Sequence, residues 1–252
     1  MQIRIWPSLK QCFLAMVVIS GMGYRSLCAE EVPVHSSASA VSLMELAHAG
    51  RAEWANFPGF QATVTLTADA TTAKTTLHVS PDGKIELTPP LGEQFRWSDR
   101  VLKSVIGHRL TQEPAITHVE FADDQVNHPH GRLLRSTNPQ EKSMWRVQGD
   151  VMTEVHRETD KSRFIISIGD VWRTPENKHL PKDFVVTTWE LPSHQIKTAR
   201  QVHQEWIRIG TTDLPAEFWA ITNDSSGKTV SHRIQFDDHK LLPLAAETTT
   251  LK

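Results

Sequence analysis

The stretch FQATVTLT, residues 60–67, alternates apolar and polar side chains along its whole length. Phe60, Ala62, Val64 and Leu66 fall on one side, while glutamine and threonine residues fall on the other. Successive side chains of a β-strand point to opposite faces of a sheet, so this alternation is typical of a strand with one buried face. The stretch therefore predicts a half-buried sheet of the kind that antiparallel strands form.

Further strand signals follow toward the C-terminus. The segment TTLHVSPDGKIEL, residues 75–87, is predicted to be a hairpin, because Pro81-Asp82-Gly83 favours a tight turn. Strands are also expected at 115–121, 131–136, 143–147, 151–157, 163–168, 184–191, 196–209, 216–222 and 230–236. A sheet of about ten strands cannot stay flat and must curl.

Two helices are expected among these strands. The apolar residues that recur at helical spacing near the N-terminus are Leu43, Leu46, Ala47, Gly50 and Trp54. Ser42 and Glu45 are expected to form a capping box, and Pro58 ends the helical pattern. A second helix is expected at about 92–108, with its apolar side chains on one face.

These elements predict an α+β protein. A large curved antiparallel sheet of about 9–11 strands, like an unclosed barrel, is expected to wrap around the N-terminal helix and the second helix. No break divides the run of strands, so a single α+β domain is expected at 42–242. A polar linker at 30–41 is expected to precede it and a C-terminal tail at 243–252 to follow it.

Residues 1–29 have the features of a signal peptide. Arg4 and Lys10 precede the apolar run CFLAMVVISGMG, and Leu27 and Ala29 suit the recognition positions for cleavage after Ala29. We therefore expect an exported protein, periplasmic or extracellular, that is soluble and not stably inserted in a membrane after cleavage. A lipid anchor at the neighbouring cysteine and an uncleaved membrane anchor are the alternatives.

Cleavage would change the chemistry of the chain. Cys12 and Cys28 would leave with the signal peptide, which excludes thiol nucleophiles, cysteine metal sites and disulfides from the mature protein. Loss of Arg4, Lys10 and Arg25 would leave 24 basic and 29 acidic residues, a net charge of −5 with histidine neutral. This balance argues against nucleic acid as a partner, because non-specific binding depends on positive charge.

The common catalytic motifs are absent from the sequence. NDSSGKT, residues 223–229, ends like a phosphate-binding loop, but Thr222 stands where the first glycine is required and a strand is expected to follow. There is no H-E-x-x-H, no G-x-S-x-G and no dinucleotide fingerprint. We assign no catalytic residue and no cofactor, and we favour a role other than catalysis.

The stretch NHPHG, residues 127–131, places His128 and His130 on either side of Pro129. Zinc or copper binds two imidazoles together with a third ligand. However, Pro129 fixes the chain between the two rings, and Asn-His-Pro before glycine is ordinary turn chemistry. We favour a solvated turn and assign no metal.

Other binding candidates lie on the predicted strands. His232 shares an apolar face with Ile234 and Phe236, where a hydrogen-bonded core histidine is more common than a ligand contact. Two pairs of neighbours, His156 with Arg157 and His108 with Arg109, lie near the edges of elements, either as binding groups or as surface pairs. Trp189, Trp206 and Trp219 lie on successive strands and either fill a core or line an apolar cavity.

Five segments, taken in order, resemble one known family. They are FPGFQATVTL, LKSVIGHRL, FADDQVNHPHGRLL, GDVMTEVHRE and the long segment from LPKDFVV to EFWAIT, within about 43–242. They resemble a bacterial and plastid family known as domain of unknown function 3386. Since that family has no assigned activity, the resemblance implies no catalytic residue.

The family pattern His-Pro-Leu-Gly-Arg bears on NHPHG. The chain matches it at His128, Pro129, Gly131 and Arg132 and departs from it at His130. The resemblance thus implies a role for His128 and Arg132 and makes His130 incidental. With these, the residues proposed for ligand binding are His128, Arg132, His156, Arg157, Trp189, Trp206, Trp219 and His232.

The order of elements is also similar to the periplasmic lipoprotein-carrier architecture, in which an unclosed barrel encloses helices over an apolar cavity. A fold does not fix a function. We favour a non-catalytic carrier of a hydrophobic small molecule or lipid. The alternatives are a structural or interaction module with a protein partner still unknown, and a hydrolase or metal enzyme that uses His128, His156 or His232.

Overall fold

The structure is a computed structural model that describes residues 39–110 and 116–243. The predicted signal peptide, most of the linker at 30–41 and nearly all of the tail at 243–252 lie outside the described residues. Within the described ranges, no helix is long and apolar enough to cross a membrane.

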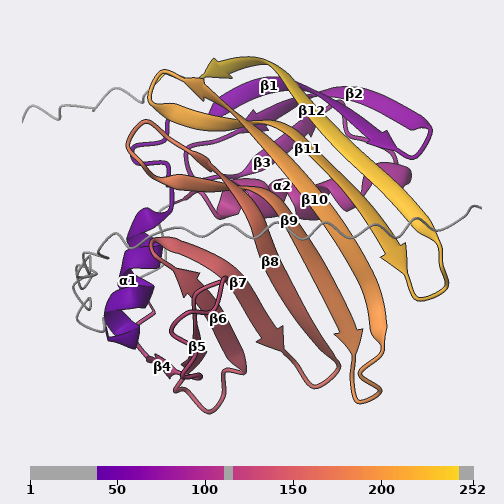
Figure 1. Ribbon diagram of the computed structural model, residues 1–252. Coiled ribbons are helices and arrows are strands. Elements are labelled where there is room, and N and C mark those ends of the chain that lie inside the picture. Colours follow the sequence, from indigo (N-terminus) through magenta and orange to yellow (C-terminus); the bar gives the residue numbers. More distant parts are fainter. Residues whose placement is uncertain (1–38, 111–115, 244–252) are drawn as a thin grey trace, which may run out of the picture. The chain divides into compact units, whose positions relative to one another are not determined.

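One antiparallel sheet of 12 strands contains all the described strands, in the order β3-β2-β1-β12-β11-β10-β9-β8-β7-β6-β5-β4 (Figure 1). Their bounds are β1 Phe60–Ala68, β2 Thr71–Val79, β3 Ile85–Thr88, β4 Val119–Phe121, β5 Arg132–Ser136, β6 Ser143–Gln148, β7 Val151–Glu158, β8 Ser162–Arg173, β9 His179–Glu190, β10 Ile196–Ile209, β11 Thr212–Asp224 and β12 Thr229–Leu241. Strands β3 and β4 form the two edges, so the curved sheet stays open. The predicted α+β class with an unclosed antiparallel sheet is confirmed, although the sheet has slightly more strands than the 9–11 expected.

Strand β1 confirms the alternation that predicted it. Phe60, Ala62, Val64 and Leu66 are all buried, and the residues between them are exposed or half-buried. β1 pairs with β2 on one side and with β12 on the other, so the first and the last strand of the described chain lie side by side near the β3 edge of the sheet. The predicted hairpin at residues 75–87 is also present, between β2 and β3.

The first helix, α1 (Ala40–Gly50), differs from its prediction. Its N-cap is Ser39, whose side chain accepts a hydrogen bond from the backbone N–H of Ser42, so the capping box predicted at Ser42 is wrong. Leu46 is 50% exposed, and Trp54 lies beyond the end of the helix. Two serines three residues apart offered the same capping chemistry. The packing of α1 against β4, β6 and β7 selected the first.

The residues that α1 buries are Ala40, Met44, Ala47 and Gly50. They form a small core with Trp145 and its neighbours on the sheet. At the end of the helix, a Cβ atom on Gly50 would lie 2.3 Å from the backbone oxygen of Asp150. Glycine at this position therefore lets the helix approach the turn between β6 and β7.

The second helix is preceded by a 3-10 turn at Glu93–Phe95 and forms α2 at Trp97–Gly107, within the predicted range 92–108. Its buried apolar residues are Val101, Leu102, Val105 and Ile106. They pack into the larger core with side chains from β1, β2, β10, β11 and β12. The two helices thus cover the same face of the sheet over two separate cores, and residues of both helices line a pocket between the cores.

Candidate functional site

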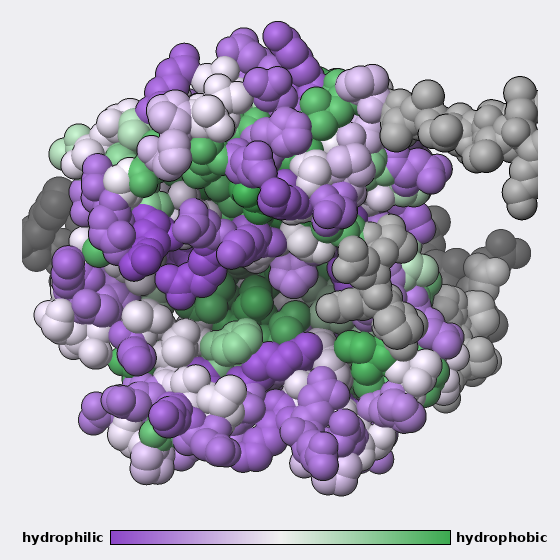
Figure 2. Space-filling model, turned by 180° about the vertical axis from the view of Figure 1, so that it is seen from behind, coloured by the Kyte–Doolittle hydropathy of each residue, from purple (hydrophilic) through white to green (hydrophobic). Residues whose placement is uncertain are grey.

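A pocket of about 290 Å³ lies between α1, α2 and strands β6 to β10. Its apolar wall includes Trp145, Val155, Ile166, Phe184 and Trp206. On the side of the molecule opposite to the view in Figure 1, hydrophobic residues lie at the floor of a hollow whose rim is hydrophilic (Figure 2). This combination of an apolar interior and a polar rim is typical of small-molecule sites.

A second hollow, of about 390 Å³, lies between β3 and the start of α2. Its wall carries Glu93, Arg96, Asp99 and Lys103, and an ion pair of 2.7 Å joins Arg96 to Glu93. Both members of this pair are largely exposed. The charges of this hollow are therefore solvated, and the pocket between the helices suits an apolar ligand better.

Of the three tryptophans proposed as binding residues, the structure places Trp206 on the pocket. Its Nε1 atom donates a hydrogen bond of 2.9 Å to the backbone oxygen of Pro181. Trp189 stacks with the Arg163 guanidinium at 4.7 Å, and Trp219 stacks on the His203 ring at 5.5 Å.

Trp189 and Trp219 lie on the other face of the sheet, so they do not line this pocket. Trp189 is an odd number of residues from Phe184 on β9, and Trp219 directly follows the core residue Phe218 on β11. Side chains alternate between faces along a strand, so each of the two points away from the helices.

Arg157 and His156 are neighbours on β7 and are separated by the same alternation. Arg157 lines the pocket, with its guanidinium 4.8 Å above the ring of Trp145. His156 lies on the opposite face, where its Nε2 atom is 2.9 Å from Oε2 of Glu154. Of the two expected binding residues, only Arg157 therefore lines the pocket.

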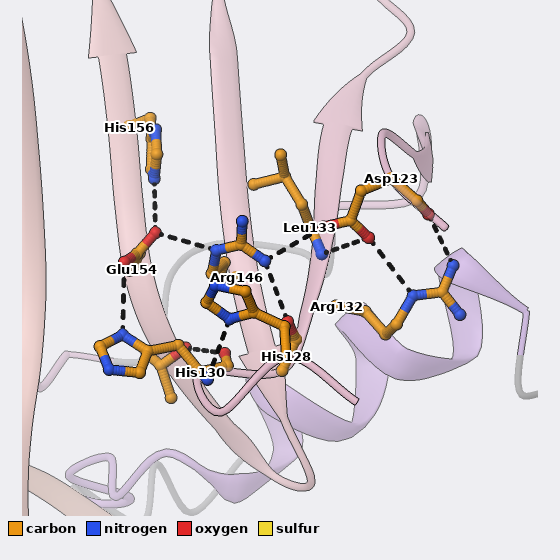
Figure 3. Close-up of polar contacts among 10 residues, drawn as sticks. Asp123, His128, His130, Arg132, Leu133, Arg146, Glu154 and His156 are labelled. Atoms are coloured by element: carbon orange, nitrogen blue, oxygen red, sulfur yellow. Dashed lines mark hydrogen bonds and ion pairs between the residues drawn. The ribbon is translucent and has the colours of Figure 1, made fainter. Parts of the chain in front are cut away.

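Glu154 is the centre of a polar cluster on that opposite face (Figure 3). Its Oε1 atom lies 3.3 Å from Nδ1 of His130, and its Oε2 atom lies 3.3 Å from Nε of Arg146. Burial alone would raise the pKa of Glu154, but its contacts with His156, His130 and Arg146 outweigh burial and lower it. Glu154 is therefore an ionised anchor for the two histidines and the arginine.

Asp123 extends this cluster toward β5. Its carboxylate lies 3.1 Å from Nη1 of Arg146 and 3.5 Å from Nε of Arg132 (Figure 3). Nη2 of Arg132 donates a hydrogen bond of 2.9 Å to the Asp123 backbone oxygen, and the guanidinium stacks on Phe121 at 3.9 Å. Arg132 and Arg146 therefore tie the segment before β5 to β5 and β6.

The NHPHG segment is a turn whose backbone N–H groups are bonded locally. The N–H of Gly131 donates to the oxygen of His128 at 2.8 Å, and the N–H of His130 donates to Nδ1 of His128 at 3.1 Å. In the described parts of the chain, no group of three or more His, Cys, Asp and Glu side chains could hold a metal ion. At Glu154, Arg146 supplies the positive charge that a metal ion would otherwise bring.

His232 lies far along the sheet from this cluster, on β12, and stacks on Trp97 of α2 with ring centroids 4.1 Å apart. Burial and the nearby Arg200 lower its pKa. The structure therefore brings His130 and His156 together through Glu154, while His232 belongs to the packing of α2.

Four pocket residues were not expected from the sequence, namely Arg51, Trp145, His179 and Gln204. His108 and Arg109, the second pair of neighbours at the edge of an element, also line the pocket. Arg109 is 6% exposed, and burial, with a smaller effect of Arg51, lowers its pKa to about 9. Burial also lowers the pKa of His179 to about 4. Arg109 directly follows a predicted helix, which is an ordinary place for a solvated arginine, so no local signal marks it as buried.

Comparison with solved structures finds a LolA superfamily protein from Nitrosomonas europaea, with a TM-score of 0.27 and 12% sequence identity. The alignment covers 83% of this chain and 96% of that protein. No curated protein matches the chain. The family described as "Protein of unknown function (DUF3386)" matches residues 35–242, most of the sequence, and the chain belongs to this family.

Proposed function

We propose that the protein binds a hydrophobic or lipid-like molecule in the pocket between the sheet and the two helices, and acts as a non-catalytic carrier. The observation that carries the proposal is the pocket itself, an apolar space of about 290 Å³ that the two cores leave between them. This volume is at the lower limit for small-molecule sites, which suits a single alkyl chain.

The pocket lining supports the proposal energetically. Aromatic and branched side chains from β6 to β10 face the space, and each methylene group that leaves water for such surroundings stabilises the complex by about 0.8 kcal/mol. An alkyl chain with many methylene groups therefore gains enough to offset the entropy that binding costs.

Export is part of the same proposal. The predicted signal peptide at 1–29 would send the mature protein to the periplasm or out of the cell, where an apolar molecule needs a protein to cross water. A carrier in such a compartment works without a cofactor and without a catalytic group.

A histidine-dependent enzyme receives less support. His156 contacts Glu154, but both oxygens of that carboxylate already have partners and Arg146 occupies the site as well. His128 accepts a hydrogen bond from its own turn, and His232 stacks on Trp97 of α2. The three histidines that such an enzyme would use do not converge.

The test is native mass spectrometry of the full chain, expressed with its N-terminal segment in a host that exports proteins. We expect added mass that extracts into organic solvent. Ile166→Trp should remove this mass because the larger ring fills the pocket, whereas Ile165→Trp, on the other face of β8, should retain it. Circular dichroism checks that both variants fold.

Two results would contradict the proposal. One is a bare protein mass together with no binding of a fluorescent fatty acid to the purified chain. The other is equal retention of the ligand by the two tryptophan variants, which would place the ligand outside this pocket.

A further inference from the structure

The ionisable residues that the structure places on the pocket wall are all basic. Among the residues that the structure describes, the wall includes three arginines and three histidines, namely Arg51, Arg109, Arg157, His48, His108 and His179, and no aspartate or glutamate. An apolar ligand alone gives no reason for this composition, because burying charged groups beside it costs free energy.

Arg109 is the most deeply buried of the three arginines. It is 6% exposed, its Nη1 atom donates to the backbone oxygen of Ala52 at 3.1 Å, and its guanidinium lies 5.6 Å from the centre of the Trp206 ring. Among the residues that the structure describes, its Nε atom has no hydrogen-bond partner and its charge has no carboxylate within ion-pair distance. Glu53 lies close enough to favour the charge, but Arg51 opposes it more strongly.

Backbone contacts hold these groups at one end of the pocket. The N–H of Ala52 donates to the oxygen of His179 at 2.9 Å, and the N–H of Trp54 donates to the oxygen of Arg109 at 2.6 Å. Nη2 of Arg51 donates to the oxygen of His108 at 3.2 Å. The segment after α1 is thus attached both to the end of α2 and to the start of β9.

Two more buried polar atoms lie on the same pocket. Nδ1 of His179 and Oε1 of Gln204 have no hydrogen-bond partner within the described ranges, and both residues are 6% exposed. A buried polar atom without a partner costs free energy, so these two side chains have hydrogen-bonding capacity that the described residues leave unused.

A purely structural explanation accounts for part of the charge. Arg51 directly follows α1, and Arg109 directly follows the C-cap of α2. Arg51 donates to the backbone oxygen of His108 at the end of α2, and Arg109 donates to that of Ala52 after α1. The dipole of a helix stabilises a cation at its C-terminus only modestly. A guanidinium buried without a carboxylate costs more than this, so the described residues leave most of the charge on Arg109 unbalanced.

We infer that the ligand is a single-chain amphiphile with an anionic head group, and that Arg109, with Arg51 beside it, binds the carboxylate or phosphate of that head group. The alkyl chain then lies along Trp145, Phe184 and Trp206 on the sheet. This inference rests on the proposed carrier function and adds the chemical class of the ligand. Guanidinium groups suit both head groups because their N–H donors match paired anionic oxygens.

The test compares head groups on a constant chain. Hexadecanoate, hexadecyl phosphate, hexadecanol and hexadecyltrimethylammonium each displace a fluorescent fatty acid from the delipidated protein. We expect one or both anions to bind about 10- to 100-fold more tightly than the alcohol, the range that a hydrogen bond to a charged group gives. The preferred anion separates a carboxylate from a phosphate ligand, and the cation should bind no better than the alcohol.

Variants assign the effect to Arg109. Arg109→Met should abolish the preference for the anion and leave the affinity for hexadecanol within about threefold, while Arg109→Lys should restore part of the preference. Arg135→Met, an exposed arginine on β5 paired with Glu120, is the matched control and should change neither affinity. If Arg109→Met does not fold, the inference is tested by the preference of the wild type for the anions and by the loss of that preference in Arg51→Met.

The outcomes separate the two proposals. Equal affinity for the anions, the alcohol and the cation would overturn the inference about the head group and leave the carrier function standing. A preference that survives Arg109→Met would overturn the assignment to this residue. Failure of every amphiphile to bind would overturn the proposed function as well.

Discussion

Nη1 of Arg146 lies 3.1 Å from the carboxylate of Asp123, and the two side chains are only 14% and 12% exposed. The carboxylate also accepts a hydrogen bond from the N–H of Leu133 at the start of β5. These contacts outweigh burial and lower the pKa of Asp123. The pair therefore fixes the segment before β5 against β6 and stabilises the edge of the sheet.

Asp123→Asn should lower the free energy of unfolding by about 2–3 kcal/mol, because it leaves Arg146 buried with one anionic partner fewer. Glu120→Gln removes the exposed partner of Arg135 and should cost less than about 1 kcal/mol. Urea denaturation of both variants measures the difference. Equal losses would show that the Asp123 pair contributes no more than a surface ion pair.

Trp206→Leu should weaken binding of the alkyl chain about tenfold, because part of the apolar wall of the pocket is lost. Trp189→Leu removes a tryptophan from the next strand, β9, on the opposite face of the sheet and should leave the affinity unchanged. Displacement of a fluorescent fatty acid gives both affinities. A loss of binding in Trp189→Leu alone would place the ligand on the face of the sheet opposite to the pocket and would contradict the prediction.

The stability of the protein should fall as the pH falls from 6.5 toward 4, in part because of His179. Burial lowers the pKa of His179 to about 4, below the value of 6.5 expected in the unfolded chain, so the unfolded state binds the proton more readily in this interval. The full contribution is present above pH 6.5 and amounts to no more than about 3.5 kcal/mol.

His179→Gln should therefore flatten the decline in unfolding free energy between pH 6.5 and pH 4. The exposed His118, replaced by glutamine, is the matched control for the loss of an imidazole. Urea titrations at several pH values give the slopes. A decline as steep in His179→Gln as in the wild type would show that other groups cause the acid sensitivity.

Gly131→Ala should destabilise the protein by more than about 2 kcal/mol. The residue has a φ of +81°, and an added Cβ atom would lie 2.0 Å from the backbone oxygen of Val147 on β6. Gly227→Ala is the control, since Gly227 has a similar φ of +83° and nothing within 4 Å of its added Cβ. Thermal unfolding should show a clearly larger loss for Gly131→Ala than for the control, and equal losses would mean that only the backbone angle matters.

The prediction of the fold worked where the signal was local. In β1, the alternation of Phe60, Ala62, Val64 and Leu66 fixes which face is buried, because a strand turns each side chain by half a revolution. The prediction of α1 worked less well. Its stripe of apolar residues included Leu46, which is exposed, because the spacing allowed more than one face and contacts with β4, β6 and β7 selected another.

The candidate site could be predicted only in part for the same reason. The sequence drew attention to Trp206 and Arg157, which line the pocket, but also to Trp189 and Trp219, which face away from it. Composition favours tryptophan in a binding site, but only strand register decides the face on which it lies.

By itself, the sequence determined an α+β chain with a long antiparallel meander, since alternation and turn residues act over a few neighbouring positions. Only the tertiary structure decided that Arg109 bonds Ala52, 57 positions away, and that His179 joins them at one end of an apolar pocket. The burial of Arg109 arises from elements distant in the sequence, so no local pattern could reveal it.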